Sequence, residues 1–195
     1  MKAKNVKSTR TPIYRDAGFL LGDIPTMKKG FADEVGHPIN PDLYIYSRYR
    51  NPTVVAAEEF YSEIEGCKWS LLSQSGMAAI DIALSVFQKK GQPNKWAFFT
   101  EIYGGTNSFI DKVLVNRRGI DAIRFAPDGN SYSLEAFDKF MEINKPQVVF
   151  FEVISNPMLL VADATEIIKI SKKHGAAVVR SEEHTSELQS LAYLV

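Results

Sequence analysis

Short apolar runs alternate with helix-forming stretches through most of this 195-residue chain. The apolar runs predict strands, and the stretches between them predict helices that open at capping residues such as Ser133 and Asp163. The expected strands are Trp69 to Ser73, Lys95 to Thr100, Asp121 to Phe125, Gln147 to Glu152 and one that begins at Ala176. Because strands that alternate with helices usually pair in parallel, the sequence predicts an α/β fold. Its sheet should be mostly parallel, with helices on both faces.

The first 52 residues lack this alternation. They hold five of the nine prolines (Pro12, Pro25, Pro38, Pro41 and Pro52) and show no clear period. Such a segment is expected to form an extended N-terminal arm that lies on another part of the protein. A helix is expected from Thr53 to Glu65, closed by Gly66, and the large domain is expected to begin there.

Charge and cysteine content exclude several classes of function. The formal net charge is +0, so no broad positive field attracts nucleic acid or an acidic membrane. No apolar run approaches the ~20 residues of a membrane span. The single Cys67 excludes an intramolecular disulfide, and the basic N-terminus has no apolar stretch behind it, so a cytoplasmic location is expected. His37, His174 and His184 are too scattered to form a metal site with Cys67, so no metal is expected.

The last sixteen residues depart from the pattern of the rest. After Val179 comes Arg-Ser-Glu-Glu-His-Thr-Ser-Glu-Leu-Gln-Ser, which resembles the translation of a common sequencing-library adapter. Residues 180–195 are therefore interpreted as a non-native tail, with a genuine polar C-terminal tail as the alternative. The expected organisation is an arm over 1–52, the first half of a large domain over 53–179, and this tail.

Several polar segments follow expected strands, at the end of an open α/β sheet where ligands bind. Ser75-Gly76-Met77 opens a helix. The unpaired N–H groups of a helix start carry about half a positive charge and bind phosphate, and glycine permits a close approach. Tyr103 and Asn156 follow later strands. On the arm, Tyr46 and Arg48 offer a phenol and a guanidinium, and the guanidinium can bind phosphate with two hydrogen bonds.

Each of these features has an ordinary structural explanation when taken alone. A Ser-Gly pair before a helix is commonly a simple N-cap, and an exposed tyrosine or arginine is commonly only solvated. Tyr103 fits a core aromatic, and Asn156 fits a plain Asn-Pro loop. For Arg50 both readings stay open, a phosphate contact or a solvated side chain.

Taken together, Tyr46-Ser47-Arg48-Tyr49-Arg50-Asn51-Pro52-Thr53 and Ser73-Gln74-Ser75-Gly76-Met77-Ala78-Ala79-Ile80 resemble one known site. It is the cofactor-phosphate site of the cysteine and methionine metabolism family of pyridoxal-phosphate enzymes, which includes cystathionine γ-synthase, cystathionine γ-lyase and methionine γ-lyase. The resemblance covers about residues 8 to 179. It implies part of a fold-type I, aspartate-aminotransferase-like large domain in a homodimeric or homotetrameric parent enzyme.

The resemblance also implies roles for the individual residues around pyridoxal 5'-phosphate. Ser75, Gly76 and Met77 would bind the phosphate, completed by Tyr46 and Arg48 from the neighbouring subunit. Tyr103 would stack on the cofactor ring and serve as the catalytic residue in proton transfer. Asn156 would donate to the ring oxygen. The substrate would be a sulfur amino acid or an activated homoserine, in trans-sulfuration by β/γ-elimination or γ-replacement.

Three departures from the family pattern limit this expectation. Ile154 stands where proline is usual, and Ser181 stands where the family has the aspartate that keeps the ring nitrogen protonated. The family's Schiff-base lysine has no counterpart in the sequence. The polypeptide is therefore expected to be an inactive fragment of such an enzyme. The alternative is a non-catalytic α/β phosphate-binding domain, which would bind nucleotides and pyridoxal phosphate comparably.

Overall fold

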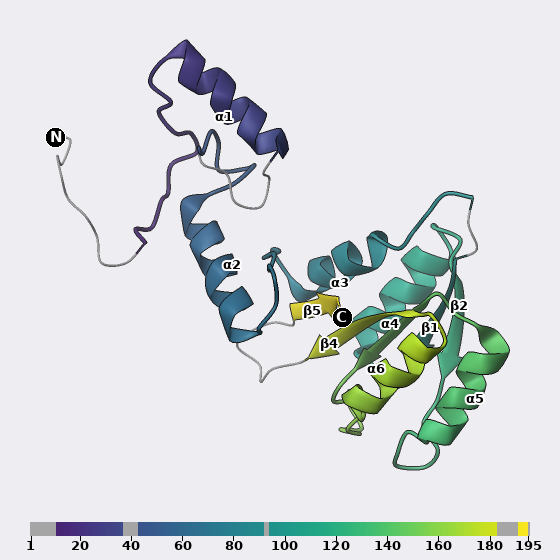
Figure 1. Ribbon diagram of the computed structural model, residues 1–195. Helices are drawn as coiled ribbons and strands as arrows, with labels where there is room; N and C mark the ends of the chain where they lie inside the picture. Colours follow the sequence, from purple (N-terminus) through teal and green to yellow (C-terminus); the bar gives the residue numbers. More distant parts are fainter. Residues whose placement is uncertain (1–10, 37–42, 92–93, 183–190, 195) are drawn as a thin grey trace. The chain divides into compact units, whose positions relative to one another are not determined.

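The computed structural model describes residues 11–36, 43–91, 94–182 and 191–194 (Figure 1). The chain divides into two compact units, Met1–Leu72 and Ser73–Val195. The first unit contains helices α1 (Ile24–Gly36) and α2 (Pro52–Ile64), and the second contains the sheet.

The prediction of an extended arm over residues 1–52 is wrong for part of that segment, because residues 24–36 form helix α1. The Asp23 carboxylate accepts a hydrogen bond of 2.8 Å from the Thr26 N–H. Hydrogen bonds from the Thr26 side chain and from this N–H lower the pKa of Asp23 below its usual value. Pro25 lies in the first helical turn, where a missing N–H costs nothing. The abundance of proline suggested an extended segment, although this proline is compatible with a helix start.

Helix α2 confirms the helix expected from residue 53, and its start shows why it forms there. The Asn51 side chain accepts from the Thr53 N–H at 2.8 Å, and Pro52 occupies the first turn. The strand predicted for Trp69 to Ser73 is wrong, because this segment belongs to no ladder. It hydrogen-bonds to α2 instead: Leu72 N–H donates to the Glu58 carboxylate at 2.9 Å.

The second unit confirms the predicted, mostly parallel sheet. Its order is β2-β1-β3-β4-β5. The strands are β1 (Lys95–Phe99), β2 (Asp121–Phe125), β3 (Val148–Glu152), β4 (Ala177–Glu182) and β5 (Leu191–Leu194). The first four pair in parallel, and β5 pairs antiparallel with β4. Strand β4 continues through the predicted boundary at residue 179, and the extent of the tail stays a prediction.

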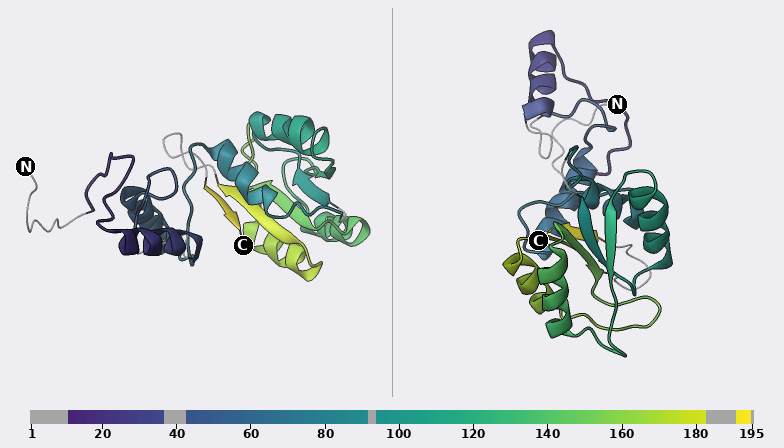
Figure 2. Two further views of the ribbon diagram at one scale, coloured as in Figure 1. Left: turned by 90° about the horizontal axis from the view of Figure 1, so that it is seen from above. Right: turned by 90° about the vertical axis from the view of Figure 1, so that its right-hand side faces the viewer.

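Helices cover both faces of the sheet (Figures 1 and 2). On one face lie α3 (Gly76–Ser85) and α4 (Gly104–Phe109), which continues as the π-helix η1 (Ile110–Val115). On the other face lie α5 (Leu134–Asn144) and α6 (Ala164–Lys173). The helix that follows β1 therefore lies on one face, whereas the helix that follows its neighbour β3 lies on the other. The strand order reverses between them, and a crevice at the carboxyl ends of β1 and β3 is the expected ligand site of such a sheet.

Aromatic side chains fill the core beneath this edge. Phe99 at the end of β1 is buried, and its ring lies within 5.5 Å of the rings of Phe125, Tyr132, Phe137 and Phe151, centre to centre. All five residues of β3 are buried, as expected for a central parallel strand. Among the residues that the structure describes, no helix is long and apolar enough to cross a bilayer.

Candidate functional site

Tyr103 is tied to the end of β3. Its backbone N–H donates to both carboxylate oxygens of Glu152, at 3.1 and 2.9 Å. Glu152 is 2% exposed, so this charge-assisted contact is protected from water. The loop after β1 is thereby drawn to the carboxyl end of β3, at the point where the strand order reverses.

The ring of Tyr103 lies against the backbone of the following glycine pair. A Cβ atom placed on Gly105 would stand 2.4 Å from Tyr103 Cε1, a distance that non-bonded carbon atoms do not adopt. Gly105 is therefore required for this position of the ring. The side chain of Tyr103 is 47% exposed, so one face of the phenol is open to a ligand.

Asn107 holds the same loop from inside the helix that follows it. Its side-chain amide donates to the carbonyl oxygens of Thr100 at 3.4 Å and Ile102 at 3.2 Å. Arg124 on β2 donates to the Asn107 side chain and to the Asp111 carboxylate, both at 2.8 Å. The loop that carries Tyr103 is thus fixed from β2 as well as from β3.

Helix α3 begins at the predicted phosphate-binding turn. Ser75 is the N-cap: its hydroxyl accepts from the Ala78 N–H at 3.2 Å, and its carbonyl accepts from the Ala79 N–H at 3.0 Å. Among the described residues, the N–H groups of Gly76 and Met77 have no hydrogen-bond partner. Two donors therefore remain at this helix start, as an anion site requires.

A second contact joins this helix start to the loop of Tyr103. The buried Thr106 hydroxyl, in the first turn of α4, lies 3.8 Å from Met77 Sδ. Both helices begin at the carboxyl edge of the sheet. The structure therefore brings the predicted phosphate turn and the predicted ring-stacking tyrosine to one place.

Asn156 follows β3 at the same edge and is partly buried. Its loop contains the departure at Ile154, which pairs with Val161 in an isolated antiparallel bridge. The hydrogen bonds beside this bridge are donated by Ser155 and Ala162, so the Ile154 N–H is not used. The bridge therefore uses no hydrogen bond from the backbone N–H that a proline at this position would lack.

Ser181 lies beside Glu152 in the register of β3 and β4 and is 1% exposed. The Val153 N–H donates to its carbonyl oxygen at 3.1 Å. The side chain at this buried position is a neutral hydroxyl. It can form a hydrogen bond, but it supplies no negative charge to a cation.

Tyr46 and Arg48 belong to the first unit and are both exposed. The Arg48 guanidinium lies over the rings of Tyr46 and Tyr49, 5.0 and 5.5 Å from their centres. Within the described part of the chain it forms no ion pair. Arg50 differs, because its guanidinium is largely buried and forms an ion pair with the buried Glu58.

Tyr132 lies below the same edge of the sheet. Burial, followed by the negative charges of Glu101 and Glu152, raises the pKa of Tyr132 to about 12. Its ring is 4.8 Å from that of Phe99, centre to centre. Tyr132 is therefore a neutral phenol in a partly buried, negatively charged surrounding.

Sequence reasoning missed the residues that hold the site together. Glu152, Gly105 and Asn107 act on the Tyr103 loop, and the sequence assigned none of them a role. Two signals were present: an acidic residue that ends an apolar strand, and a glycine pair that follows a tyrosine. His37 and His184, weighed as metal ligands, lie outside the described residues.

The fold and the helix start define an α/β domain of the fold-type I pyridoxal-phosphate enzymes. This chain is similar to a crystal structure from Campylobacter jejuni that is assigned as an O-acetylhomoserine (thiol)-lyase. The match covers 89% of this chain and 39% of the Campylobacter chain. Its TM-score is 0.69 and its sequence identity 30%, and the Campylobacter structure carries a pyridoxyl-lysine phosphate. The chain belongs to the Cys/Met metabolism PLP-dependent enzyme family, whose profile matches residues 1–185.

Curated relatives agree with this assignment. Cystathionine β-lyase of Lactococcus lactis is 36% identical over 138 residues, which is 70% of this chain and 33% of the relative. Homocysteine/cysteine synthase of Saccharomyces cerevisiae is 32% identical over 174 residues, which is 89% of this chain and 36% of the relative. The chain thus spans about a third of the length of these relatives.

The residues present fit two of three parts of this family's cofactor, the phosphate and the ring face, but not the ring nitrogen. The free N–H groups of Gly76 and Met77 suit a phosphate, and the open face of the Tyr103 ring suits a flat aromatic ring. Ser181 does not suit the protonated ring nitrogen, which needs a negative partner.

Proposed function

We propose that this chain supplies the phosphate-binding half of the cofactor site in an enzyme of sulfur amino-acid metabolism. The reaction is β/γ-elimination or γ-replacement of the cystathionine γ-synthase or lyase type. The substrate is a sulfur amino acid or an activated homoserine. The observation that carries the proposal is the tie between Tyr103 and Glu152, beside a helix start with two available N–H groups.

Pyridoxal 5'-phosphate supplies an electron sink for the substrate carbanion when it is bound. Gly76 and Met77 donate their N–H groups to the phosphate, and Ser75 keeps the helix start in shape through its cap. Tyr103 would cover one face of the ring, held there by Glu152 through its own N–H, and its phenol oxygen would take part in proton transfer. Asn156 donates its amide to the ring oxygen.

Tyr46 and Arg48 complete the phosphate site of a second copy in a homodimer or homotetramer. The support for this part is their exposure and the Arg48 guanidinium, which is oriented by two tyrosine rings rather than by a carboxylate. A planar guanidinium binds phosphate with two parallel hydrogen bonds. We also propose a cytoplasmic location, which the single cysteine supports.

The 195-residue polypeptide is proposed to be inactive by itself, because the neutral Ser181 occupies the position that needs a carboxylate. Incubation with pyridoxal phosphate and cystathionine should release no ammonia or 2-oxo acid. Measurable release above a protein-free control would contradict this part of the proposal and leave cofactor binding untouched.

A titration tests cofactor binding directly. The chain is titrated by calorimetry with pyridoxal 5'-phosphate, with pyridoxal and with adenosine monophosphate. We expect the tightest binding for pyridoxal 5'-phosphate, since only this ligand combines a phosphate with a small flat ring. Equal affinity for the nucleotide would favour a non-catalytic phosphate-binding domain instead.

A further inference from the structure

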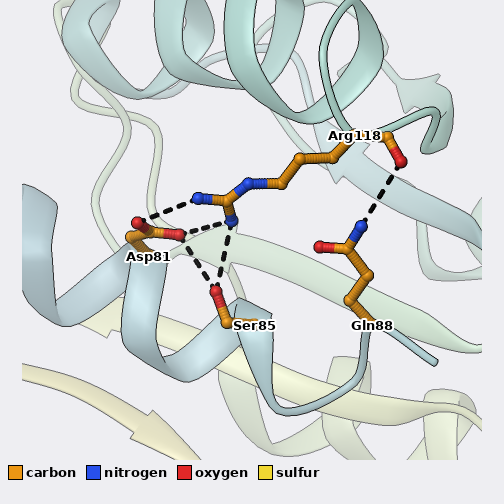
Figure 3. Close-up of polar contacts among 4 residues, drawn as sticks. All are labelled: Asp81, Ser85, Gln88 and Arg118. Atoms are coloured by element: carbon orange, nitrogen blue, oxygen red, sulfur yellow. Dashed lines mark hydrogen bonds and ion pairs between the residues drawn. The ribbon is translucent and has the colours of Figure 1, made fainter. Parts of the chain in front are cut away.

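Asp81 and Arg118 form a two-bond ion pair outside the candidate site (Figure 3). Arg118 Nη1 lies 2.6 Å from Asp81 Oδ1, and Nη2 lies 3.1 Å from Oδ2. Ser85 joins the pair, because its hydroxyl is 3.1 Å from Asp81 Oδ1 and 3.2 Å from Arg118 Nη1. The hydrogen bond from Arg118 lowers the pKa of Asp81 and raises that of Arg118.

This ion pair links the two helices that carry the candidate site. Asp81 and Ser85 belong to α3, while Arg118 follows the end of η1. Gln88, just beyond α3, donates its side-chain amide to the Arg118 carbonyl oxygen at 3.3 Å. The guanidinium also lies 5.8 Å from the centre of the Phe109 ring, at the junction of α4 and η1.

The remaining contacts of α3 do not fix its rotation as firmly. Its buried side chains Ile80, Ala83 and Leu84 are apolar, and apolar packing is non-directional. At its start, the only described polar contact to α4 is the weak one between Met77 Sδ and the Thr106 hydroxyl at 3.8 Å. A planar guanidinium on a carboxylate adds directional specificity that apolar contacts lack.

We propose that the Asp81–Arg118 pair is a positioning device for the cofactor site. It fixes the rotation of α3 against α4 and η1. It thereby sets the two N–H groups of Gly76 and Met77 relative to Tyr103 at the start of α4. This inference rests on the proposed function, because it assigns the pair a role in binding pyridoxal 5'-phosphate.

The pair is suited to substitution, because it lies near the surface and the buried core does not depend on it. The side chains of Asp81 and Arg118 are 37% and 28% exposed, so solvent screens the pair, and its loss should leave the fold intact. A matched control exists on the other face of the sheet. Asp138, with a side chain 38% exposed, joins α5 to Lys173 and His174 at the end of α6.

The first test reads the helix start in the chain without ligand. Backbone amide NMR shifts of Gly76, Met77 and Tyr103 are compared in the parent chain, D81N, R118K and D138N. We expect D81N and R118K to move these three signals, R118K because an ammonium cannot form the planar fork. D138N should leave them in place. Shift changes confined to residues around 81 and 118 would overturn the inference.

The second test measures pyridoxal 5'-phosphate affinity by calorimetry. Because a misplacement of about 1 Å costs up to about a hundredfold in well-positioned sites, we expect D81N to bind roughly tenfold more weakly. R118K should bind as weakly as D81N, and D138N should match the parent chain. The double variant D81N/R118K should bind no worse than either single variant, since both remove one device.

The outcomes separate this inference from the proposed function. If the parent chain binds pyridoxal 5'-phosphate and D81N binds it equally well, the positioning role is overturned while the function stands. If the parent chain does not bind it, the proposed function fails. The amide shifts alone then decide whether the pair sets the start of α3.

Discussion

The two faces of the sheet are built alike but differ at the starts of their helices. On each face a partly exposed aspartate forms an ion pair that joins helical segments, Asp81 on one face and Asp138 on the other. The first turn of α3 holds no acidic residue, and two of its N–H groups are available. Helices α5 and α6 begin with Glu135 and Glu166 in their first turns.

We expect this difference in charge to favour an anion on one face. A carboxylate in the first turn already occupies the favourable field of the helix dipole and repels a second negative charge. At α6 the effect is stronger, because Asp163 is itself the cap and accepts from the Glu166 N–H at 3.1 Å. Helices on both faces cover the core. We propose that phosphate binds only on the face with α3 and α4, the binding face, and we call the face with α5 and α6 the covering face.

The largest expected effect belongs to the covering face. Phe137 on α5 is buried against Phe99 and Phe125, so Phe137→Ala should lower the free energy of unfolding by about 3–5 kcal/mol. Urea denaturation measures this loss. Below the transition, the affinity for pyridoxal 5'-phosphate should stay unchanged. A parallel loss of affinity would show that the faces are not independent.

Gly105→Ala should give the opposite result on the binding face. The new Cβ would stand 2.4 Å from the Tyr103 ring, so the ring must move, and the half-exposed phenol can do so. We expect affinity for pyridoxal 5'-phosphate to fall by roughly tenfold because a small misplacement is costly in a site. Gly104→Ala is the control, since a Cβ there meets nothing within 4 Å beyond its two neighbours in the chain.

Alkaline pH should reveal the negative surrounding beneath the edge. Because the pKa of Tyr132 is raised to about 12, its stabilising effect is complete below the ordinary tyrosine pKa. It is lost as the pH rises from about 10 towards 12. We expect the free energy of unfolding to fall by on the order of 1 kcal/mol, and thermal melts at pH 8 and pH 11 measure this loss. The variant Tyr132→Phe should lose less over this interval, and an equal loss would contradict the assignment.

Acid pH should affect both aspartates alike, and only weakly. A hydrogen bond from Arg118 lowers the pKa of Asp81. Hydrogen bonds from Lys173 and His174 lower the pKa of Asp138. Each aspartate therefore stabilises the fold above the ordinary aspartate pKa of about 3.9, and this stability is lost as the pH falls through the folded value. D81N and D138N should both flatten the acid limb of a stability curve slightly. A marked effect of one alone would mean that the two pairs are not equivalent in the fold.

The sequence predicted the sheet well because its signals are local. Apolar runs such as Val148-Val149-Phe150-Phe151 and caps such as Ser133 each act within a few residues. The strand predicted at 69–73 failed because an apolar run needs a ladder partner, and this one bonds to Glu58 instead.

For the candidate site, the sequence pointed only to the residues that we propose face the ligand. Ser75, Gly76 and Tyr103 stand in motifs that a linear sequence displays. The contact between Tyr103 and Glu152 joins residues 49 apart and exists because β1 and β3 are neighbours. The Asp81–Arg118 pair spans 37 residues for a similar reason. Such contacts depend on strand order, which the pattern of apolar residues does not specify.

One pair of variants tests most directly whether the start of α3 binds the cofactor phosphate. Ser75→Asp gives α3 the charged cap that α6 has in Asp163, whereas Ser75→Asn gives it the neutral cap that α2 has in Asn51. Both are good helix caps, so both should fold. Calorimetry with pyridoxal 5'-phosphate and with pyridoxal should show phosphate-dependent affinity retained in Ser75→Asn and lost in Ser75→Asp. Equal affinities of the two variants for pyridoxal 5'-phosphate would contradict the account.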